Sequence, residues 1–151
     1  MQVLVDSKAR VQPVPATPLR LVVNELIENA LAALSGTRNA PILISATVKR
    51  RPFLLRSYLV LEVADKGAGM PPAIVAKATT PFFSTRAGNH TGLGLTACSQ
   101  MVSALKGKLI IDSAHGVGTT VEVRVPVLST AAIFWQSFLR HRRKKVHTWR
   151  G

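Results

Sequence analysis

Two strand-like segments lie close together in the middle of the chain. Residues 41–48, PILISATV, and residues 57–65, SYLVLEVAD, are rich in β-branched and other apolar residues. The basic segment KRRPFLLR between them is too short to hold a helical crossover, so the two strands are expected to pair antiparallel. The sequence therefore predicts a sheet with antiparallel neighbours at the centre of the fold.

A long helix is predicted before this strand pair. Apolar residues recur with nearly helical period over residues 19–34. Thr17 as a helix cap and Pro18 at the first helical position mark its start, and Gly36 marks its end. Residues 3–15 are expected to be extended, because their two prolines exclude a helix interior.

The second half of the chain predicts a short helix, a loop, a longer helix and a β-hairpin. The short helix covers residues 72–78, the loop covers residues 80–91, and the longer helix follows two glycines and stops at Gly107. The hairpin strands KLIIDS and TTVEVRVPV flank AHGVG, whose glycines suit positive φ angles. Four alternating valines are expected to face the core, and they are Val121, Val123, Val125 and Val127. This order of elements predicts an α+β fold: a two-layer α/β sandwich with helices on one face of a mixed, mostly antiparallel sheet.

Composition excludes several classes of protein. No apolar segment reaches the roughly eighteen residues that a membrane span needs, and the N-terminus lacks the pattern of a signal peptide. The single cysteine, Cys98, excludes an internal disulfide and a cysteine-based zinc site, and its apolar helix face predicts a buried, inert thiol. These features favour a soluble protein in a reducing, cytoplasmic setting.

The formal net charge of +13 is partly a property of the C-terminal tail. Residues 128–151 contain no Asp or Glu, and they include the basic cluster RHRRKK. This tail is expected to be disordered or irregular, although a patch for anionic lipid or nucleic acid, or a helix that docks on a partner, is an alternative. Aromatic residues make up 5% of the chain and do not alternate with basic ones, which argues against nucleic acid as the main partner.

An aspartate and two glycines follow the second of the central strands. Asp65 ends the apolar segment, and Gly67, Gly69 and Met70 come directly after it. A carboxylate at a strand end can accept a hydrogen bond from a ligand amine, and glycines let the backbone pass close to a ligand. The alternative is an aspartate that serves only a helix cap or a tight turn.

A second glycine pair precedes the longer helix. Gly92 and Gly94 flank Leu93, and the backbone N–H groups at the start of a helix suit phosphate oxygens. Thr91 adds a hydroxyl, and the preceding loop has the composition of a mobile lid with Gly88 as a hinge. A purely structural glycine pair is the alternative.

Glu25 and Asn29 are four residues apart on the long helix, so they are expected to share one face. The amide oxygen of Asn29 suits Mg²⁺, which takes few protein ligands. A solvated face formed by Asn24, Glu25 and Glu28 is the alternative.

These motifs, together with PFFST at residues 81–85 and Leu95 after the second glycine pair, resemble a known ATP-binding domain. It is shared by sensor histidine kinases, gyrase-type topoisomerases, mismatch-repair ATPases and a heat-shock chaperone, and has the Bergerat-type fold. The resemblance spans residues 17–127 and includes the closing GTT at residues 118–120. The phenylalanine motif and the short lid are most similar to histidine kinases of the nitrogen- and oxygen-sensing type.

The resemblance implies a Mg²⁺–ATP site. Asp65 is expected to bind the exocyclic amine of adenine, and Asn29 is expected to hold Mg²⁺, with Glu25 as a proton-accepting helper. The remaining ATP-binding residues that it implies are Gly67, Gly69, Met70, Thr91, Gly92, Leu93, Gly94 and Leu95, with Thr119 and Thr120 reaching adenine through water. The phenylalanines Phe82 and Phe83 are expected to pack the root of the lid.

The chain departs from the family pattern at one place on the long helix. Many members carry a cation or tyrosine three or four residues after the asparagine, where this chain has Ala32 and Ala33. Arg86 in the lid is a hypothetical substitute for that charge.

The resemblance also implies partners. None of the four histidines has the sequence context of a phosphoacceptor, so a dimerisation and phosphohistidine domain of the same or another chain is expected, with a response regulator downstream. The predicted organisation is an extended segment at 1–16, an ATPase domain at 17–127 and the tail at 128–151, in a parent protein that is cytoplasmic or membrane-anchored. A non-catalytic nucleotide-binding switch, similar to anti-sigma kinases, is the alternative function.

Overall fold

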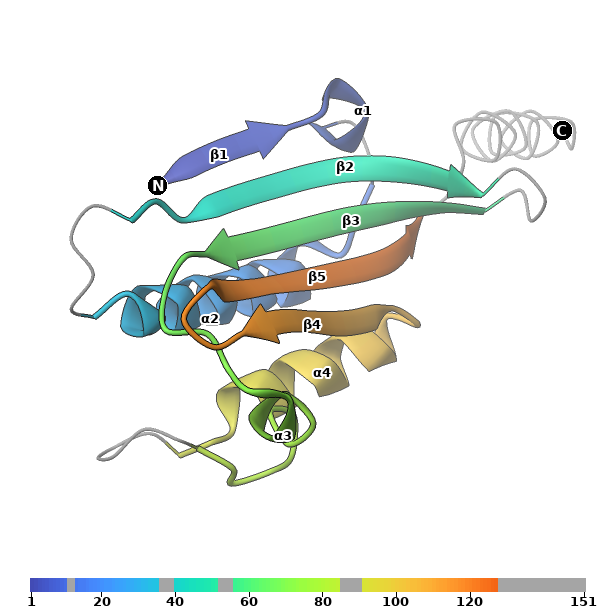
Figure 1. Cartoon of the computed structure of the whole chain (residues 1–151). Helices are drawn as coiled ribbons and strands as arrows, with labels where there is room; N and C mark the ends of the chain where they lie inside the picture. Colours follow the sequence, from blue (N-terminus) through green and yellow to red (C-terminus); the bar gives the residue numbers. More distant parts are fainter. Residues whose placement is uncertain (11–12, 36–39, 52–55, 85–90, 128–151) are drawn as a thin grey trace, which may run out of the picture.

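The computed structural model describes residues 1–10, 13–35, 40–51, 56–84 and 91–127. In this part of the chain a five-stranded sheet is covered by helices on one face (Figure 1). The strands are β1 (Gln2–Val5), β2 (Leu43–Arg51), β3 (Arg56–Asp65), β4 (Lys108–Ala114) and β5 (Gly118–Val127). The helices are α1 (Ser7–Arg10), α2 (Ala16–Ala33), α3 (Pro72–Val75) and α4 (Gly94–Ala104).

The strand order in the sheet is β1-β2-β3-β5-β4. The neighbours β2 and β3 are antiparallel, as their short connection predicts, and β3–β5 and β4–β5 are antiparallel too. Strand β1 pairs with β2 in parallel, which makes the sheet mixed. The predicted α+β sandwich is therefore confirmed.

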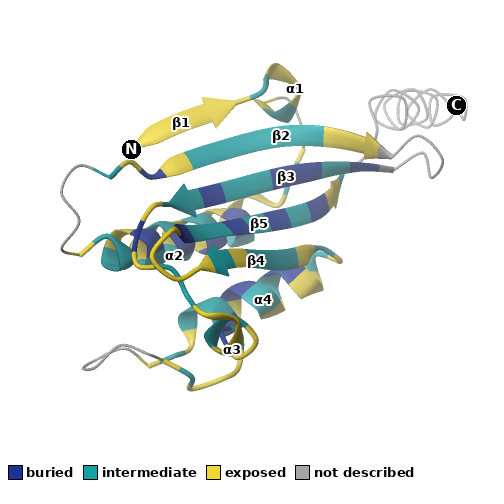
Figure 2. Ribbon diagram, viewed as in Figure 1, coloured by how far each residue is buried: buried dark blue, intermediate teal, exposed yellow. Residues whose placement is uncertain are grey.

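The core lies between the sheet and the two long helices. Helix α2 packs against β3 and β5, and α4 packs against β4 and α2. The valines of β5 face this layer as predicted, with Val121, Val123 and Val125 buried and Val127 packed against the core. Figure 2 shows that burial is concentrated in β3, β5 and the inner sides of α2 and α4.

The helix boundaries differ from two of the predictions. Helix α2 starts at Ala16, one residue before Thr17, and its cap position is Pro15 without a side-chain hydrogen bond. Thr17 therefore lies within the first turn and is not the cap, while Gly36 lies outside the described residues. The segment predicted as extended forms β1 and then α1, because its prolines come after that short helix.

Residues with positive φ angles form the β4–β5 hairpin turn and the end of α4. In the hairpin between β4 and β5, Gly116 and Gly118 have φ angles of 77° and 132°, as the glycines of AHGVG predict. Helix α4 ends one residue earlier than expected, because Lys106 and not Gly107 adopts the left-handed conformation, with φ 56°. No helix in the described ranges is long and apolar enough to cross a membrane.

Candidate functional site

A cavity of about 290 Å³ lies between α2 and the ends of β3 and β5. Helix α2 and the residues after it contribute Leu26, Asn29, Ala30, Ala32, Ala33 and Ser35. The sheet, the loop after β3 and α4 contribute Val63, Asp65, Ala68, Gly69, Met70, Leu95, Thr119 and Val121. Six residues that the sequence predicts as site residues therefore meet in one place: Asn29, Asp65, Gly69, Met70, Leu95 and Thr119.

Asp65 is the last residue of β3 and lies on the wall of this cavity. Its Oδ1 accepts a hydrogen bond from the backbone N–H of Gly67 at 2.8 Å, which is the geometry of an Asx turn. No hydrogen bond joins Oδ2 to another described residue. The tight-turn interpretation thus accounts for one carboxylate oxygen and leaves the role of the second open.

The two glycines after Asp65 allow the loop to contact the protein closely on both sides. A Cβ at Gly67 would lie 2.5 Å from the carbonyl oxygen of Ala33, and a Cβ at Gly69, where φ is 61°, would overlap the carbonyl oxygen of Ala114. The N–H of Ala68 donates to the Ala33 carbonyl at 3.2 Å, which ties the loop to the end of α2. These protein contacts alone require glycine at both positions, and the close approach to a ligand that the sequence suggests stays a prediction.

A serine that the sequence analysis missed connects two of the cavity-lining residues, Met70 and Thr119. The N–H of Met70 donates to Ser113 Oγ at 2.8 Å, and Ser113 Oγ donates to the Gly118 carbonyl at 3.0 Å. Thr119 Oγ1 lies 2.9 Å from the same Ser113 oxygen. A hydroxyl has one proton, which Ser113 uses toward Gly118, so Thr119 is the donor in the third contact. The position of Ser113 opposite Thr119 in the register was the available signal.

Glu25 and Asn29 lie on one face of α2, as their spacing predicts. Asn29 Nδ2 donates to Glu25 Oε1 at 3.2 Å, which orients the amide of Asn29 on the cavity wall. A Cβ on Gly94 would overlap the Glu25 carboxylate, so this carboxylate lies against the start of α4. Both side chains are half-buried, whereas Glu28 is exposed. Glu25 and Asn29 are therefore partly enclosed, whereas Asn24 and Glu28 are exposed, as expected for a solvated face.

The Glu25 carboxylate also affects the buried thiol of α4. Cys98 has no exposed surface, as predicted, and its Sγ lies 3.9 Å from the Val22 carbonyl oxygen. Burial raises the pKa of Cys98 to about 12, and the negative charge of Glu25 adds to this shift. The thiol is consequently protonated and inert at neutral pH.

The predicted phosphate loop lies beside the cavity and not on its wall. Gly92 has φ 65° and packs against the backbone of Phe82 and Phe83. Leu93 occupies the cap position of α4, and no side chain caps the helix. Among the described residues no side-chain cap is bonded to the first N–H groups of α4, and such groups can bind an anion. Thr91 is exposed next to this turn.

Four residues expected at the site or in the lid are placed elsewhere or lie beyond the described part. Thr120 does not line this cavity, but it lines a neighbouring cavity of about 430 Å³ whose wall also includes Asp65 and Thr119. Phe82 is 78% exposed with φ 63°, so it does not pack the root of the lid. Thr96, which donates to the Thr79 carbonyl at 3.1 Å, ties the start of α4 to the segment before the lid instead. Arg86 lies outside the described residues, as does Gly88.

The donor set fits a metal ion that is shared with a ligand. No cluster of three or more His, Cys, Asp or Glu side chains occurs in the described ranges, so these residues hold no closed metal cage. Mg²⁺ is usually held by one or two protein oxygens together with phosphates and water. The amide of Asn29 on the cavity wall fits that mode of binding.

This α+β sandwich places the carboxylate of Asp65 and the amide of Asn29 on one cavity beside the start of α4, as expected for an ATP-binding domain. The chain belongs to the family described as histidine kinase-, DNA gyrase B-, and HSP90-like ATPase, whose model matches residues 15–129.

Sensor kinases are among the relatives of this chain. The sensor kinase CckA of Brucella abortus is 37% identical over 93 residues, which make up 61% of this chain and 10% of that protein. The two-component sensor PprA of Pseudomonas aeruginosa is 34% identical over 119 residues, 77% of this chain and 12% of that protein. The chain thus spans about a tenth of the length of these relatives.

Solved histidine kinase structures share the fold. The nucleotide-free catalytic domain of histidine kinase ThkA aligns with a TM-score of 0.68 and 22% identity, over 85% of this chain and 80% of that one. The histidine kinase domain of a blue-light-activated kinase from Erythrobacter litoralis aligns with a TM-score of 0.61 and 26% identity, over 83% of this chain and 50% of that one.

Proposed function

We propose that this chain is the ATP-binding catalytic domain of a two-component sensor histidine kinase, and that residues 17–127 carry the activity. The observation that carries the proposal is the convergence of Asp65, Asn29 and Thr119 on one cavity. The family match and the sensor-kinase relatives support it.

Asp65 selects the adenine base in this proposal. Its Oδ1 is held by the Gly67 N–H, and its Oδ2 accepts the proton of the exocyclic amine. Guanine carries a carbonyl at the matching position, so it would place an acceptor against the carboxylate. The hydroxyl of Thr119 donates its proton to Ser113 Oγ. The lone pairs of the Thr119 oxygen are then free to accept a hydrogen bond from a ligand or a bridging water.

Asn29 and the start of α4 position the phosphates. The amide oxygen of Asn29 is the proposed protein ligand for Mg²⁺, which supplies charge neutralisation between the phosphate groups when bound. Glu25 orients that amide through its hydrogen bond with Nδ2. The uncapped N–H groups at Gly94 and Leu95 donate hydrogen bonds to phosphate oxygens. Positioning of the phosphates, together with electrostatic stabilisation, lowers the barrier to phosphoryl transfer.

The phosphoryl acceptor in this proposal is a histidine on a separate dimerisation domain, from the same or another chain. A response regulator then receives the phosphoryl group. We place the domain in the cytoplasm, where ATP is available, and Arg86 of the lid is the proposed cation for the γ-phosphate. Residues 128–151 are proposed to be a tail outside the ATPase domain.

One observation favours a second candidate, a nucleotide-binding switch that does not transfer phosphate. Ala32 and Ala33 line the cavity where many family members carry a cation or a tyrosine, so α2 supplies no positive charge there. A switch needs affinity for nucleotide but not stabilisation of the transferring phosphoryl group.

Phosphotransfer to an isolated acceptor distinguishes the two candidates. The chain is incubated with γ-labelled ATP, Mg²⁺ and a histidine-containing helical hairpin domain, and Asn29→Asp and Glu28→Gln serve as the test variant and the matched surface control. Label on the hairpin that is lost with Asn29→Asp and retained with Glu28→Gln supports the kinase. Nucleotide binding without any label supports the switch, and absence of both refutes the nucleotide site.

A further inference from the structure

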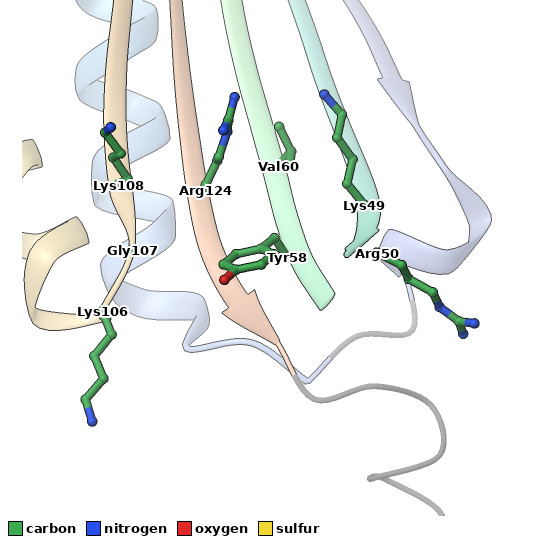
Figure 3. A pocket seen from close by; sticks show the side chains of 8 residues that line it. All are labelled: Lys49, Arg50, Tyr58, Val60, Lys106, Gly107, Lys108 and Arg124. Carbon is green, nitrogen blue, oxygen red and sulfur yellow. The ribbon is translucent and has the colours of Figure 1, made fainter. Parts of the chain in front are cut away.

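A second cavity with strong positive charge lies on the face of the sheet opposite the nucleotide cavity. Its volume is about 460 Å³. Figure 3 shows its lining residues, which come from four neighbouring strands and from the turn before β4. They are Lys49, Arg50, Tyr58, Val60, Lys106, Gly107, Lys108 and Arg124, and we call this site the basic cavity.

The two cavities are separated by the alternation of side chains along the strands. On β5, Thr119 and Val121 line the nucleotide cavity, whereas Arg124 lines the basic cavity. On β3, Val63 lines the nucleotide cavity, whereas Val60 lies in the basic one. A ligand in the basic cavity therefore contacts a set of side chains that the nucleotide does not use.

The positive charge of the basic cavity is only partly neutralised. Glu122 contacts the Nε of Arg124 and lies 4.0 Å from the Nζ of Lys49, which is also 4.0 Å from Glu62. These two carboxylates belong to the next row of the sheet and do not line the cavity. Five lining residues are cationic and none is acidic, so an anion that enters meets a net positive field.

Lys108 and Lys106 are the cations without a carboxylate partner. In the described part of the chain neither forms an ion pair, and both are exposed. Lys108 pairs directly with Arg124 across β4 and β5, so the two side chains stand next to each other on this face. An adjacent lysine and arginine are a suitable pair for one phosphate group.

The backbone holds Lys106 in a conformation that usually requires glycine. Its N–H donates to the Ser103 carbonyl at 2.8 Å and the Gly107 N–H donates to the Val102 carbonyl at 2.9 Å, which is the Schellman pattern at a helix end. A Cβ at Gly107 would lie 2.5 Å from the Arg124 carbonyl oxygen, so α4 ends tightly against β5. A lysine at the left-handed position keeps a cation at the rim of the cavity despite the unfavourable φ angle.

The floor of the basic cavity is formed by the central strand β3. Tyr58 and the buried Val60 lie on β3, between Lys49 on β2 and Arg124 on β5. The backbones of these flanking strands are two strand spacings, about 10 Å, apart. The Glu122 carboxylate nonetheless contacts Arg124 and lies 4.0 Å from Lys49 Nζ, so the cationic ends of both side chains are within reach of one anionic group.

We propose that the basic cavity binds a small soluble anion that carries phosphate, independently of the nucleotide site. The volume is that of a small-molecule pocket and favours such a ligand over an extended macromolecule. Lys108 and Arg124 bind the phosphate, and Lys49 adds positive charge from the other side of Tyr58. The helix dipole of α4 accounts for a lysine near its end but not for cations on three strands.

The test is a titration of the full chain with inorganic tripolyphosphate, followed by backbone amide chemical shifts. The nucleotide site is first saturated with a non-hydrolysable Mg²⁺–ATP analogue. We expect saturable shifts at Lys106, Gly107, Lys108 and Arg124, with none at Gly67 or Gly94. Lys108→Glu should weaken binding at least tenfold, whereas Lys77→Glu, which makes the same charge change at an exposed site outside the cavity, should change it less than twofold.

Three results would overturn the proposal. Equal weakening by Lys108→Glu and Lys77→Glu would indicate diffuse attraction to a basic protein. Shifts confined to residues 128–151 would assign the binding to the tail. Lys108-dependent binding to phosphatidylglycerol vesicles without binding of tripolyphosphate would identify a membrane-facing surface and not a site for a soluble ligand.

Discussion

The substitution Asp65→Asn separates the two functions assigned to this carboxylate. The Asx turn needs one acceptor, and Oδ1 accepts the Gly67 N–H at 2.8 Å. Adenine recognition needs a second acceptor at Oδ2. Asparagine has a single side-chain oxygen, so it can satisfy the turn or the base but not both.

The cost of this substitution follows from the hydrogen bond that is lost. If the amide oxygen keeps the turn, an N–H₂ group faces the amine of adenine, and a hydrogen bond to a charged group, about 1.5–3 kcal/mol, disappears. The two opposed donors add about 1–3 kcal/mol, because each is left without an acceptor. ATP affinity should therefore fall by at least about 100-fold, since about 1.4 kcal/mol corresponds to a tenfold change. The free energy of unfolding should change by less than about 0.5 kcal/mol, as for a surface substitution that keeps its contacts.

Isothermal titration calorimetry with Mg²⁺–ATP and urea denaturation measure these two quantities. Asp112→Asn is the matched control, because Asp112 is an exposed carboxylate on β4 that does not line the nucleotide cavity. Retained ATP affinity in Asp65→Asn, with stability also retained, would mean that the carboxylate serves only the turn. That result would refute adenine recognition by Asp65.

Three further predictions concern the packing around the two cavities. Gly94→Ala places a methyl group against the Glu25 carboxylate and should destabilise the chain by about 1–3 kcal/mol. In a Glu25→Ala background the same substitution should cost less than about 0.5 kcal/mol. Additive effects of the two substitutions in this double-mutant cycle would contradict the contact. Lys106→Gly removes the strain of a left-handed lysine, which costs about 1–2 kcal/mol, and loses a smaller stabilisation from the helix dipole and from chain entropy. Thermal unfolding should therefore occur at an equal or higher temperature. A decrease of more than about 1 kcal/mol in the free energy of unfolding would contradict the strain. Cys98 should resist iodoacetamide at pH 8 in the folded chain, because its pKa is raised to about 12. The stability that the protonated thiol contributes to the folded state is present below the ordinary pKa of 9.0 and is lost as the pH rises toward 12. Alkylation of the folded chain as fast as in urea would contradict the burial of Cys98.

The strands and the main helices could be predicted because their signals are local. Alternating valines on β5 and the short connection between β2 and β3 determine which face is buried and which strands are antiparallel. The same spacing rule brought Glu25 and Asn29 together on α2. The prediction of Thr17 as the cap of α2 was wrong, because the helix already starts at Ala16. Sequence alone does not decide between neighbouring positions for the start of a helix.

The features that sequence reasoning missed depend on contacts between distant segments. The importance of Ser113 follows from its position opposite Thr119 and from the N–H of Met70, which no local pattern reveals. Thr119 and Thr120 have the same residue type, but only Thr119 lines the nucleotide cavity, while both line the neighbouring cavity. The basic cavity gathers cations from three strands and from the turn before β4, which are scattered in the sequence, so a count of basic residues gave no indication of it.

The most direct test of the central claim compares two nucleotides on the unmodified chain. Calorimetric titration with Mg²⁺–ATP and with Mg²⁺–GTP measures whether the cavity beside Asp65 selects adenine. We predict saturable binding of one Mg²⁺–ATP and at least about 100-fold weaker binding of Mg²⁺–GTP, because a guanine carbonyl would face the carboxylate. Absence of heat with Mg²⁺–ATP, or equal affinity for both nucleotides, would contradict the site.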